Sequence, residues 1–490
     1  MTGVQSIDYA AIAPPLLLAV VAITVLVLDA FLPAGRRIVA AGGVSLGGLV
    51  AAAALLLPLV GDRRQTFCVP GDGLVLPACS YAVDELTVVF QALVLAGAVV
   101  VALLSFDTVR DSSLPAGEYF FLLLASVTGA LTMAASRDAA TLVISLEVVS
   151  LPAFALAGLR RYDSRSSEAA LKLFLVSVVS TALTLFGLSL VYGLTGSLHL
   201  ERIATALEDP GSRSPAMVLG VTLALAGFGF KVAAVPFHFW APDTYEGAPV
   251  PIAAYLSVVS KAAGFVGLAI LLTIGFAPYT DVWGPAVAVV AALTMTVGNL
   301  VALRQTQVVR LLAWSSVAQS GYMLVPLGAA LAGDVDAVLP ATVAYVAAYA
   351  VMNLGAFAVV TLVGRDRQAN RLADYQGLAR TEPLSAFALA FSLASLAGLP
   401  PGLLGLFAKI VVFRAPVGEG VGWLAVVMAV NVVIGLVYYL RWAASMYARP
   451  EDGSVLPSYR ISWSDGVAVG MTLGAALLLS VLPDPILRFG

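Results

Sequence analysis

The 490-residue sequence has few charged residues and few residues that could bind a cofactor. Charged residues make up 11% of the chain and hydrophobic residues 60%. The two cysteines, Cys68 and Cys79, are too few to hold an iron–sulfur cluster. No glycine-rich phosphate-binding motif is present, and basic residues do not alternate with aromatic ones as in nucleic-acid-binding surfaces. We therefore expect no metal, no cofactor and no nucleic-acid partner on this chain.

What the sequence does have is one apolar run after another. Runs of about 20 apolar residues are long enough to cross a bilayer core. The first has no basic residue before it and is too long for a signal peptide, so we expect it to be retained as a helix. The sequence predicts an all-α integral membrane protein, one polytopic domain over 1–490, with about fourteen transmembrane helices at 11–32, 38–60, 84–106, 118–136, 139–159, 168–192, 214–238, 250–274, 283–303, 308–331, 337–362, 383–415, 419–447 and 465–486.

The arginines predict the orientation. With the N-terminus outside, fifteen of the 22 arginines fall in or near inner connections, as the positive-inside rule requires. We therefore expect a multi-pass protein of the cell (inner) membrane with both termini on the outer side. Cys68 and Cys79 then share the outer loop 61–83, where a disulfide between them and two separate thiols are both compatible with the spacing. The PGDG sequence at Pro70 predicts a small hairpin in the same loop.

Lysine is scarce, and its placement is the main functional clue. All four lysines lie in apolar runs, whereas the 22 arginines lie in loops or near helix ends. Arginine does not lose its proton in proteins, whereas a desolvated lysine can become neutral at physiological pH. A charged side chain at the bilayer centre costs about 2.5–3.5 kcal/mol on insertion scales. The pattern indicates proton exchange by the four lysines, Lys172, Lys231, Lys261 and Lys409.

Prolines interrupt two of the predicted helices beside a lysine. Pro236 follows Lys231 and should free the carbonyl of Val232, because proline has no N–H. Pro400 and Pro401 precede Lys409 and should free the carbonyls of Leu396 and Ala397 in the same way. Interrupted helices at membrane depth are typical of ion sites in transporters. An ordinary packing kink would explain a proline but not the lysine next to it.

The two breaks also predict a repeat. If the helices of 118–275 form one unit and those of 283–447 another, each broken helix is the fourth member of its unit. A shift by five helices reverses the direction of crossing, so the two units would be inverted repeats. An N-terminal three-helix segment, 1–117, and a last helix, 465–486, complete this division.

Other polar residues surround the lysines. Glu147 lies in the middle of the fifth predicted helix, and His238 follows the first break, where it could relay between Lys231 and Lys261. Lys172 lies near a helix start, four residues from Glu168, where snorkelling to the headgroups explains it equally well. Serine, tyrosine, asparagine and glutamine residues in the ninth to eleventh predicted helices could together hold water along a buried axis. Taken singly, such residues often only make contacts between helices.

These residues also identify a family. The segment FKVAAVPFHFWAPDTYEGAPVPIAAYLSVVSK, together with LEVVSLP, ALKLF, AWSSVAQSGYM and GLPPGLLGLFAK, resembles the antiporter-like membrane subunit N of NADH–quinone oxidoreductase, respiratory complex I. The resemblance runs from about Glu118 to Tyr447. Related subunits usually carry histidine at the position of Lys261, and one has glutamate at that of Lys409, so these two lysines favour subunit N.

The resemblance implies a function, a site and partners. Glu147, Lys231, Lys261 and Lys409 would transfer protons, with Lys172 and His238 in support. The FMN, the iron–sulfur clusters and the quinone site would belong to other subunits. The partners would be other membrane subunits, above all the neighbouring antiporter-like subunit and the small helical subunits, and lipids.

Two departures and two alternatives accompany this resemblance. The family often has histidine where this chain has Gln319. Glutamine cannot titrate, so a relay at this position would need water. The family commonly has a basic residue directly before Arg310, and this chain has Val309 there instead. This difference would alter the inner contact surface. The alternatives are an Mrp-type cation/proton antiporter subunit and a structural subunit whose channel is vestigial.

Overall fold

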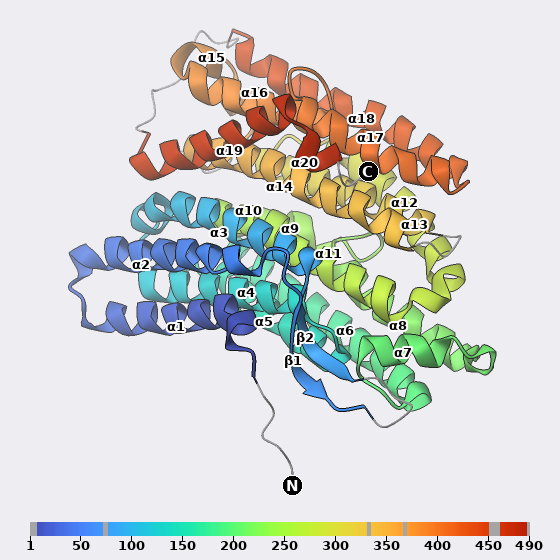
Figure 1. Ribbon diagram of the computed structural model, residues 1–490. Coiled ribbons are helices and arrows are strands. Elements are labelled where there is room, and N and C mark those ends of the chain that lie inside the picture. Colours follow the sequence, from blue (N-terminus) through green and yellow to red (C-terminus); the bar gives the residue numbers. More distant parts are fainter. Residues whose placement is uncertain (1–6, 72–76, 331–334, 366–369, 450–460, 488–490) are drawn as a thin grey trace.

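The computed structural model describes residues 7–71, 77–330, 335–365, 370–449 and 461–487. Nearly all of these residues lie in helices packed side by side. Figure 1 shows the first half of the chain, in blue and green, below the second half, in yellow to red. Within the described part of the chain, eleven helices are long and apolar enough to cross a membrane. The predicted all-α membrane fold is confirmed.

The N-terminal segment contains three long helices and one small sheet. Its elements are α1 (Tyr9–Phe31), α2 (Ala34–Ala54), β1 (Arg64–Val69), β2 (Ala78–Val83) and α3 (Glu85–Asp111). The strands pair antiparallel with Cys68 opposite Cys79, so the predicted hairpin is present. Asp72 and Gly73 of the predicted turn lie outside the described residues.

The next segment contains the first broken helix. Its elements are α4 (Ala116–Ala135), α5 (Ala139–Ala157), α6 (Ser164–Thr195), the amphipathic α7 (Leu200–Leu207), α8 (Pro215–Lys231), α9 (Trp240–Gly247), α10 (Val250–Tyr255) and α11 (Lys261–Ile270). Two single π-helical turns, Leu256–Ser260 and Leu271–Gly275, flank α11 and join it with α10 into one membrane-length helix. π-Turns within helices occur frequently at functional sites, and Lys261 directly follows the first.

The last segment contains the second broken helix. Its elements are α12 (Thr280–Ala302), α13 (Val308–Ala329), α14 (Val335–Gly364), α15 (Leu378–Thr381), α16 (Pro383–Ala397), α17 (Leu403–Gly418), α18 (Gly422–Tyr447), α19 (Trp463–Val481) and α20 (Asp484–Leu487).

Each predicted apolar run overlaps one of these helices or a broken pair, although the run predicted at 214–238 continues past the end of α8 into the first break. Both breaks lie at the predicted prolines. Residues 232–239 separate α8 from α9, and residues 398–402 separate α16 from α17. Two hydrogen bonds hold the chain around the first break: Val235 N donates to Thr294 Oγ1 at 2.9 Å, and Trp240 Nε1 donates to the carbonyl of Phe230, in α8, at 3.0 Å. These bonds connect the break to α12 and α9 to the end of α8.

The first two helices of each proposed repeat pack against each other in a similar way. In the first unit α4 packs closely on α5, and in the second α12 packs closely on α13. Both crossings depend on a glycine. A Cβ on Gly129 would lie 2.6 Å from the backbone nitrogen of Val149, and one on Gly298 would lie 2.5 Å from that of Ala318. This correspondence fits inverted repeats, which remain a prediction from position.

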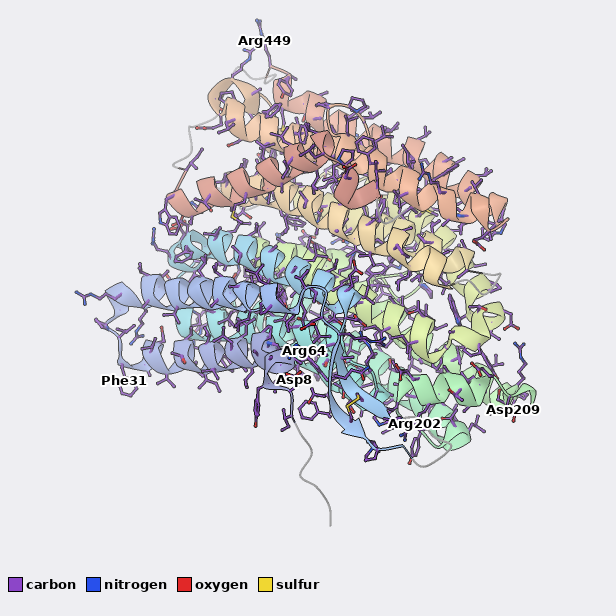
Figure 2. The ribbon with its side chains drawn as sticks, in the orientation of Figure 1. Asp8, Phe31, Arg64, Arg202, Asp209 and Arg449 are labelled. Carbon is purple, nitrogen blue, oxygen red and sulfur yellow. A yellow bond between two sulfur atoms is a disulfide. The ribbon has the colours of Figure 1, made fainter. Side chains whose placement is uncertain are left out.

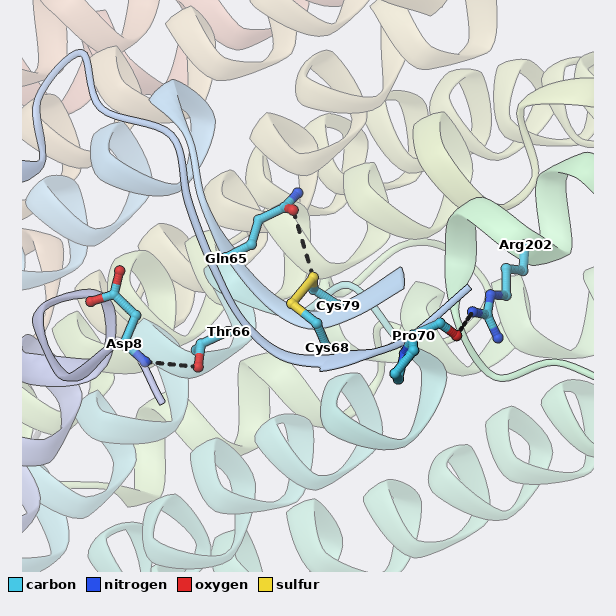
Figure 3. The surroundings of a disulfide bond; sticks show 7 residues. All are labelled: Asp8, Gln65, Thr66, Cys68, Pro70, Cys79 and Arg202. Carbon is cyan, nitrogen blue, oxygen red and sulfur yellow. Dashed lines mark hydrogen bonds between the residues drawn. A yellow bond between two sulfur atoms is a disulfide. The ribbon is translucent and has the colours of Figure 1, made fainter. Parts of the chain in front are cut away.

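The hairpin lies at the end of the bundle where α1 begins. Cys68 and Cys79 are joined by a disulfide. The carboxylate of Asp8 accepts from Arg64, 3.2 Å away, and Thr66 Oγ1 accepts from the backbone N–H of Asp8 (Figures 2 and 3). Figure 3 also shows Arg202, from α7, reaching the carbonyl of Pro70. The hairpin thus ties the start of α1 to α7.

The same end of the bundle holds a buried ion pair. Arg137, 5% exposed, donates to Asp84 at 2.6 Å and to Thr87 Oγ1 at 3.0 Å. Burial raises the pKa of Asp84, but the Arg137 guanidinium and the N–H of Thr87 lower it by more, so that it lies below its usual value. Stability from this pair is therefore present at neutral pH and is lost as the pH falls through the folded-state pKa.

Replacing Arg137 with methionine tests this ion pair. We expect Arg137→Met to lower the free energy of unfolding by about 1–3 kcal/mol, since Asp84 keeps its helix-capping bond but loses its cation. The loss of stability at acid pH should also be smaller in this variant than in the native protein. Thermal unfolding from about pH 7 to about pH 2 measures both, with Arg63→Met, an exposed arginine near the hairpin, as control. An equal acid sensitivity in Arg137→Met and the native protein would contradict the assignment.

Candidate functional site

Three of the four lysines lie in the interior of the bundle. Lys231, Lys261 and Lys409 are 7%, 2% and 8% exposed. None of the three has an ion pair with a carboxylate within the described residues. Burial without a paired carboxylate disfavours the charged form of an amine. Each of them instead donates to uncharged oxygen atoms.

Lys231 is the last residue of α8 and lies near Glu147 of α5. Its Nζ donates to Ser150 Oγ at 2.8 Å, and Ser150 in turn donates to the carbonyl of Leu146 at 2.7 Å. Glu147, half-buried, accepts from Thr181 of α6 at 2.5 Å. Glu147 lies one turn before Ser150, the partner of Lys231, on the same helix.

Lys261 lies at the centre of the bundle, after the first π-turn. Its Nζ donates to the carbonyl of Ser316 at 2.7 Å and to Ser316 Oγ at 2.5 Å. The hydroxyl of Tyr349 donates to the same Oγ at 2.8 Å, and the ring of Tyr349 lies 5.9 Å from Nζ. The hydroxyl of Ser316 is the first proton-bearing group next to this amine.

Lys409 binds the carbonyls that the second break leaves free. Its Nζ donates to Leu396 O and to Ala397 O, both at 2.7 Å. These are the two carbonyls that Pro400 and Pro401 were predicted to release. The ring of Tyr322 lies 5.7 Å from the same nitrogen.

A network of uncharged polar side chains lies between Lys261 and Lys409. Gln319, one turn along α13 from Ser316, donates to Tyr439 at 3.1 Å and at 3.4 Å to the Leu396 carbonyl that Lys409 also binds. Tyr345 donates to Gln319 Oε1 at 2.7 Å. All these side chains are buried. Gln319 therefore lies between the two lysines, bonded to one partner of Lys409.

Lys172 is different, because its side chain is 43% exposed. It pairs with Glu168 at 2.7 Å and with Asp243 of α9 at 2.8 Å, and Asp243 also pairs with Arg310 at 2.8 Å. Burial raises the pKa of Asp243, but Lys172 and Arg310 lower it by more. Glu246 completes this cluster around a pocket of about 280 Å³. Lys172 thus lies at a polar mouth of the bundle.

His238 lies in the first break, half-buried, with its ring 5.3 Å from that of Trp314. Its Nδ1 has no hydrogen-bond partner in the described part of the chain. No hydrogen bond joins it there to Lys231 or Lys261. Its place as a relay stays a prediction.

Several site residues gave no signal in the sequence. Thr181 and Ser150, which hold Glu147 and Lys231, are ordinary helix residues, and only the fold brings α5, α6 and α8 together. Asp243 and Glu246 stand in the segment WAPDTYEG, whose acidic residues close to a broken helix could have been singled out.

Comparisons with known proteins place this geometry in a family. The model of the family described as NADH:quinone oxidoreductase/Mrp antiporter, transmembrane, matches residues 136–435. A subunit N 2 of NADH-quinone oxidoreductase from Streptomyces griseus is 56% identical over 505 residues, covering 99% of this chain and 94% of that protein. The chain belongs to the subunit N family of NADH-quinone oxidoreductase. A second subunit N, from Salinispora tropica, is 45% identical, and the match covers 94% of this chain and 88% of that protein.

Solved structures agree with membership of the subunit N family. A chain of respiratory complex I from Thermus thermophilus superposes with a TM-score of 0.78 at 32% identity, covering 97% of this chain and 98% of that one. A chain of the Mrp complex from Dietzia sp. has a TM-score of 0.81 at 22% identity, over 98% and 96% of the two chains, which shows a shared fold only. The protein is therefore a multi-span membrane subunit of a multi-subunit respiratory complex, and the subunit N assignment is favoured over an Mrp antiporter.

Proposed function

We propose that this subunit itself transfers protons, through Glu147, Lys231, Lys261 and Lys409, when NADH reduces quinone in the complex. Lys172 and His238 support this axis at the inner mouth and at the first break. The observation that carries the proposal is that three amines are buried without a carboxylate partner, each against a break, a π-turn or freed carbonyls. Such amines can change charge without breaking an ion pair.

The proposed mechanism is electrostatic. Desolvation favours a neutral amine and a nearby anion favours the ammonium ion. Moving Glu147 away from Lys231, or changing its partner, would release a proton toward Lys261 and on to Lys409, which would discharge to the outer side. Moving one charge across 100 mV takes about 2.3 kcal/mol, and a shift of one pKa unit corresponds to about 1.36 kcal/mol. A swing of about two pKa units is therefore of the required size.

The energy must come from elsewhere in the complex. The only two cysteines of the chain form a disulfide. We infer that the FMN, the iron–sulfur clusters and the quinone site belong to other subunits, and that this chain holds no cofactor. The neighbouring antiporter-like subunit, the small helical subunits and lipids would cover the apolar faces, such as that of Ile144 and Val148 beside Glu147.

Replacing Lys261 with arginine tests the proposal. Arginine keeps the positive charge and the hydrogen-bond donors but does not release a proton. We expect Lys261→Arg to lower the number of protons moved per NADH oxidised, while the complex still assembles. Membrane vesicles with a pH-sensitive dye measure the protons, and a native gel measures assembly. An undiminished ratio in an assembled enzyme would refute proton exchange at Lys261.

We propose further that the complex lies in the cell membrane with both termini of this chain outside. Predicted outer arginines, Arg64, Arg137 and Arg202, lie at the hairpin end, whereas Arg110 and Arg365 share a cluster with Asp107. Among the other counted arginines, Arg367, Arg460 and Arg488 lie outside the described residues.

Thiol labelling tests this orientation. After reduction, we expect Cys68 and Cys79 to react with a membrane-impermeant maleimide added to intact cells. The matched control is Tyr162→Cys, at a fully exposed residue of the loop after α5, in a Cys68→Ser, Cys79→Ser background. This cysteine should label only in opened membranes. The reverse pattern would mean that the orientation is inverted.

A further inference from the structure

A cavity of about 530 Å³ lies at the end of the bundle opposite the hairpin, since α3 starts next to β2 and ends at this cavity. One wall is the loop between α3 and α4, residues 112–115. The other is the loop between α5 and α6, which contributes Leu159, Arg160, Arg161 and Asp163. The volume is in the range of small-molecule binding sites. No residue of the proposed proton axis lines this cavity, so the axis does not explain it.

The two arginines of this cavity have no counter-charge. Arg160 is half-buried and Arg161 is exposed. Within the part of the chain that the structure describes, neither forms an ion pair with a carboxylate. The one carboxylate that lines the cavity, Asp163, caps α6, because it accepts from the backbone N–H of Arg165 at 2.9 Å. The cavity is therefore lined by two positive charges and by one negative charge that already has a partner.

The pocket around Lys172 has the opposite arrangement. Its charged residues are three cations and three carboxylates, namely Arg165, Lys172, Arg310, Glu168, Asp243 and Glu246. Lys172 and Arg310 each pair with two of these carboxylates. A pocket that balances its own charges has no electrostatic need of a ligand. Two adjacent guanidinium groups without a partner repel each other unless an anion binds between them.

The facing loop adds hydrogen-bond donors. Ser112 and Ser113 line the cavity, and within the described residues their hydroxyls donate to no protein acceptor. Ser113 and Tyr162, one in each loop, have left-handed backbone conformations, with φ of 50° and 63°. Such conformations are unfavourable for residues other than glycine and cluster at sites such as ligand clamps. Phosphate oxygens accept hydrogen bonds both from arginine and from hydroxyl groups.

The cavity lies at the level of a membrane surface, because the four membrane-length helices α3 to α6 end or begin there. Tyr162, beside the arginines, is fully exposed, and tyrosine is enriched at membrane–water interfaces. Within about three turns of the loop, α5 and α6 expose the apolar side chains of Leu151, Leu171 and Phe174. A molecule with an anionic head and apolar tails fits this surface.

We propose that this cavity binds the phosphate group of an anionic phospholipid. Arg160 and Arg161 bind the phosphate oxygens, Ser112 and Ser113 donate to them from the facing loop, and the acyl chains lie along the apolar side chains of α5 and α6. The planar guanidinium group matches phosphate with two parallel hydrogen bonds, and basic pockets between membrane helices bind anionic headgroups. This inference does not depend on proton transfer, because it uses no residue of the proposed axis.

The double variant Arg160→Gln/Arg161→Gln tests the site, because glutamine removes the charges and keeps a polar side chain. The complete complex is transferred into phosphatidylcholine bilayers with increasing cardiolipin, and the cardiolipin retained after washing is counted by mass spectrometry. We expect the double variant to bind cardiolipin about 30-fold more weakly, which is about 2 kcal/mol for two basic side chains at a membrane surface. The matched control is Arg36→Gln/Arg37→Gln, an exposed arginine pair at the start of α2, which should bind as the native complex does.

The other results would each overturn the proposal. Equal weakening in both double variants would mean that surface charge alone attracts the lipid, and native binding in Arg160→Gln/Arg161→Gln would mean that these arginines do not bind it. If excess inorganic phosphate in pure phosphatidylcholine raises the thermal stability of the native complex as much as cardiolipin does, the ligand is a free anion. If the double variant is less stable than the native complex in pure phosphatidylcholine, the arginines hold protein, such as a neighbouring subunit, and not lipid.

Discussion

Replacing Lys409 with methionine is expected to stop proton exit and to weaken the second broken helix at the same time. Methionine has a similar length but no charge and no donor. The carbonyl of Ala397 loses the amine that binds it, whereas Leu396 O keeps its weaker bond to Gln319. A buried acceptor left without a partner costs about 1–3 kcal/mol. We therefore expect a lower thermal stability as well as a loss of proton transfer.

The variant Lys409→Arg separates the two effects. The guanidinium can still donate to the carbonyls, so the stability should largely return, but it does not exchange protons. Proton transfer should therefore stay as low as in Lys409→Met. The number of protons moved per NADH measures proton transfer, and thermal unfolding measures stability. Recovery of proton transfer in Lys409→Arg would mean that a fixed charge suffices, which contradicts proton exchange at this position.

Replacing Gly405 with alanine should have the largest structural effect of any single methyl group at the second break. A Cβ on Gly405, one turn before Lys409, would overlap the carbonyl oxygen of Ser395 in α16, a backbone atom that cannot turn away. Overpacking of this kind costs about 1–3 kcal/mol and sometimes more. The shift of α17 would also draw Lys409 away from its carbonyls. We expect Gly405→Ala to reduce both the assembled complex and its proton transfer.

The matched control is Gly474→Ala in α19. A Cβ there meets nothing within 4 Å, and alanine favours a helix more than glycine does, by about 1 kcal/mol. This variant should assemble at least as well as the native chain. Native gels and thermal unfolding compare the two. Equal assembly of both variants would show that α17 can move away from α16 at no cost, which contradicts the close packing of Gly405 on Ser395.

The sequence predicted the framework because the bilayer imposes strong rules on it. Apolar length located the helices, and missing proline N–H groups located both breaks. The freed carbonyls of Leu396 and Ala397 followed from the same rule, and the fold then supplied Lys409 as their donor. The hairpin also followed from its turn and β-branched residues.

The contacts across the chain could not be predicted in this way. Lys172 and Asp243 are 71 residues apart, and Lys261 and Ser316 are 55 apart. Periodicity describes a helix by itself and does not say which helices meet. The amphipathic helix α7 lies between two predicted spans and was not predicted, because at eight residues it is too short for a membrane span. Asp465 lies at the start of a predicted helix, and nothing in the sequence indicates that it is fully buried against Arg365.

The most direct test of the central claim is the number of protons moved per NADH oxidised in membranes that carry Glu147→Ala or Lys231→Ala, with assembly checked beside it. The central claim is that a carboxylate sets the charge of a buried amine, so that removing either partner stops transfer through this subunit. We predict a lower ratio in both variants with NADH oxidation and assembly retained. Native ratios in both, in fully assembled complexes, would contradict it.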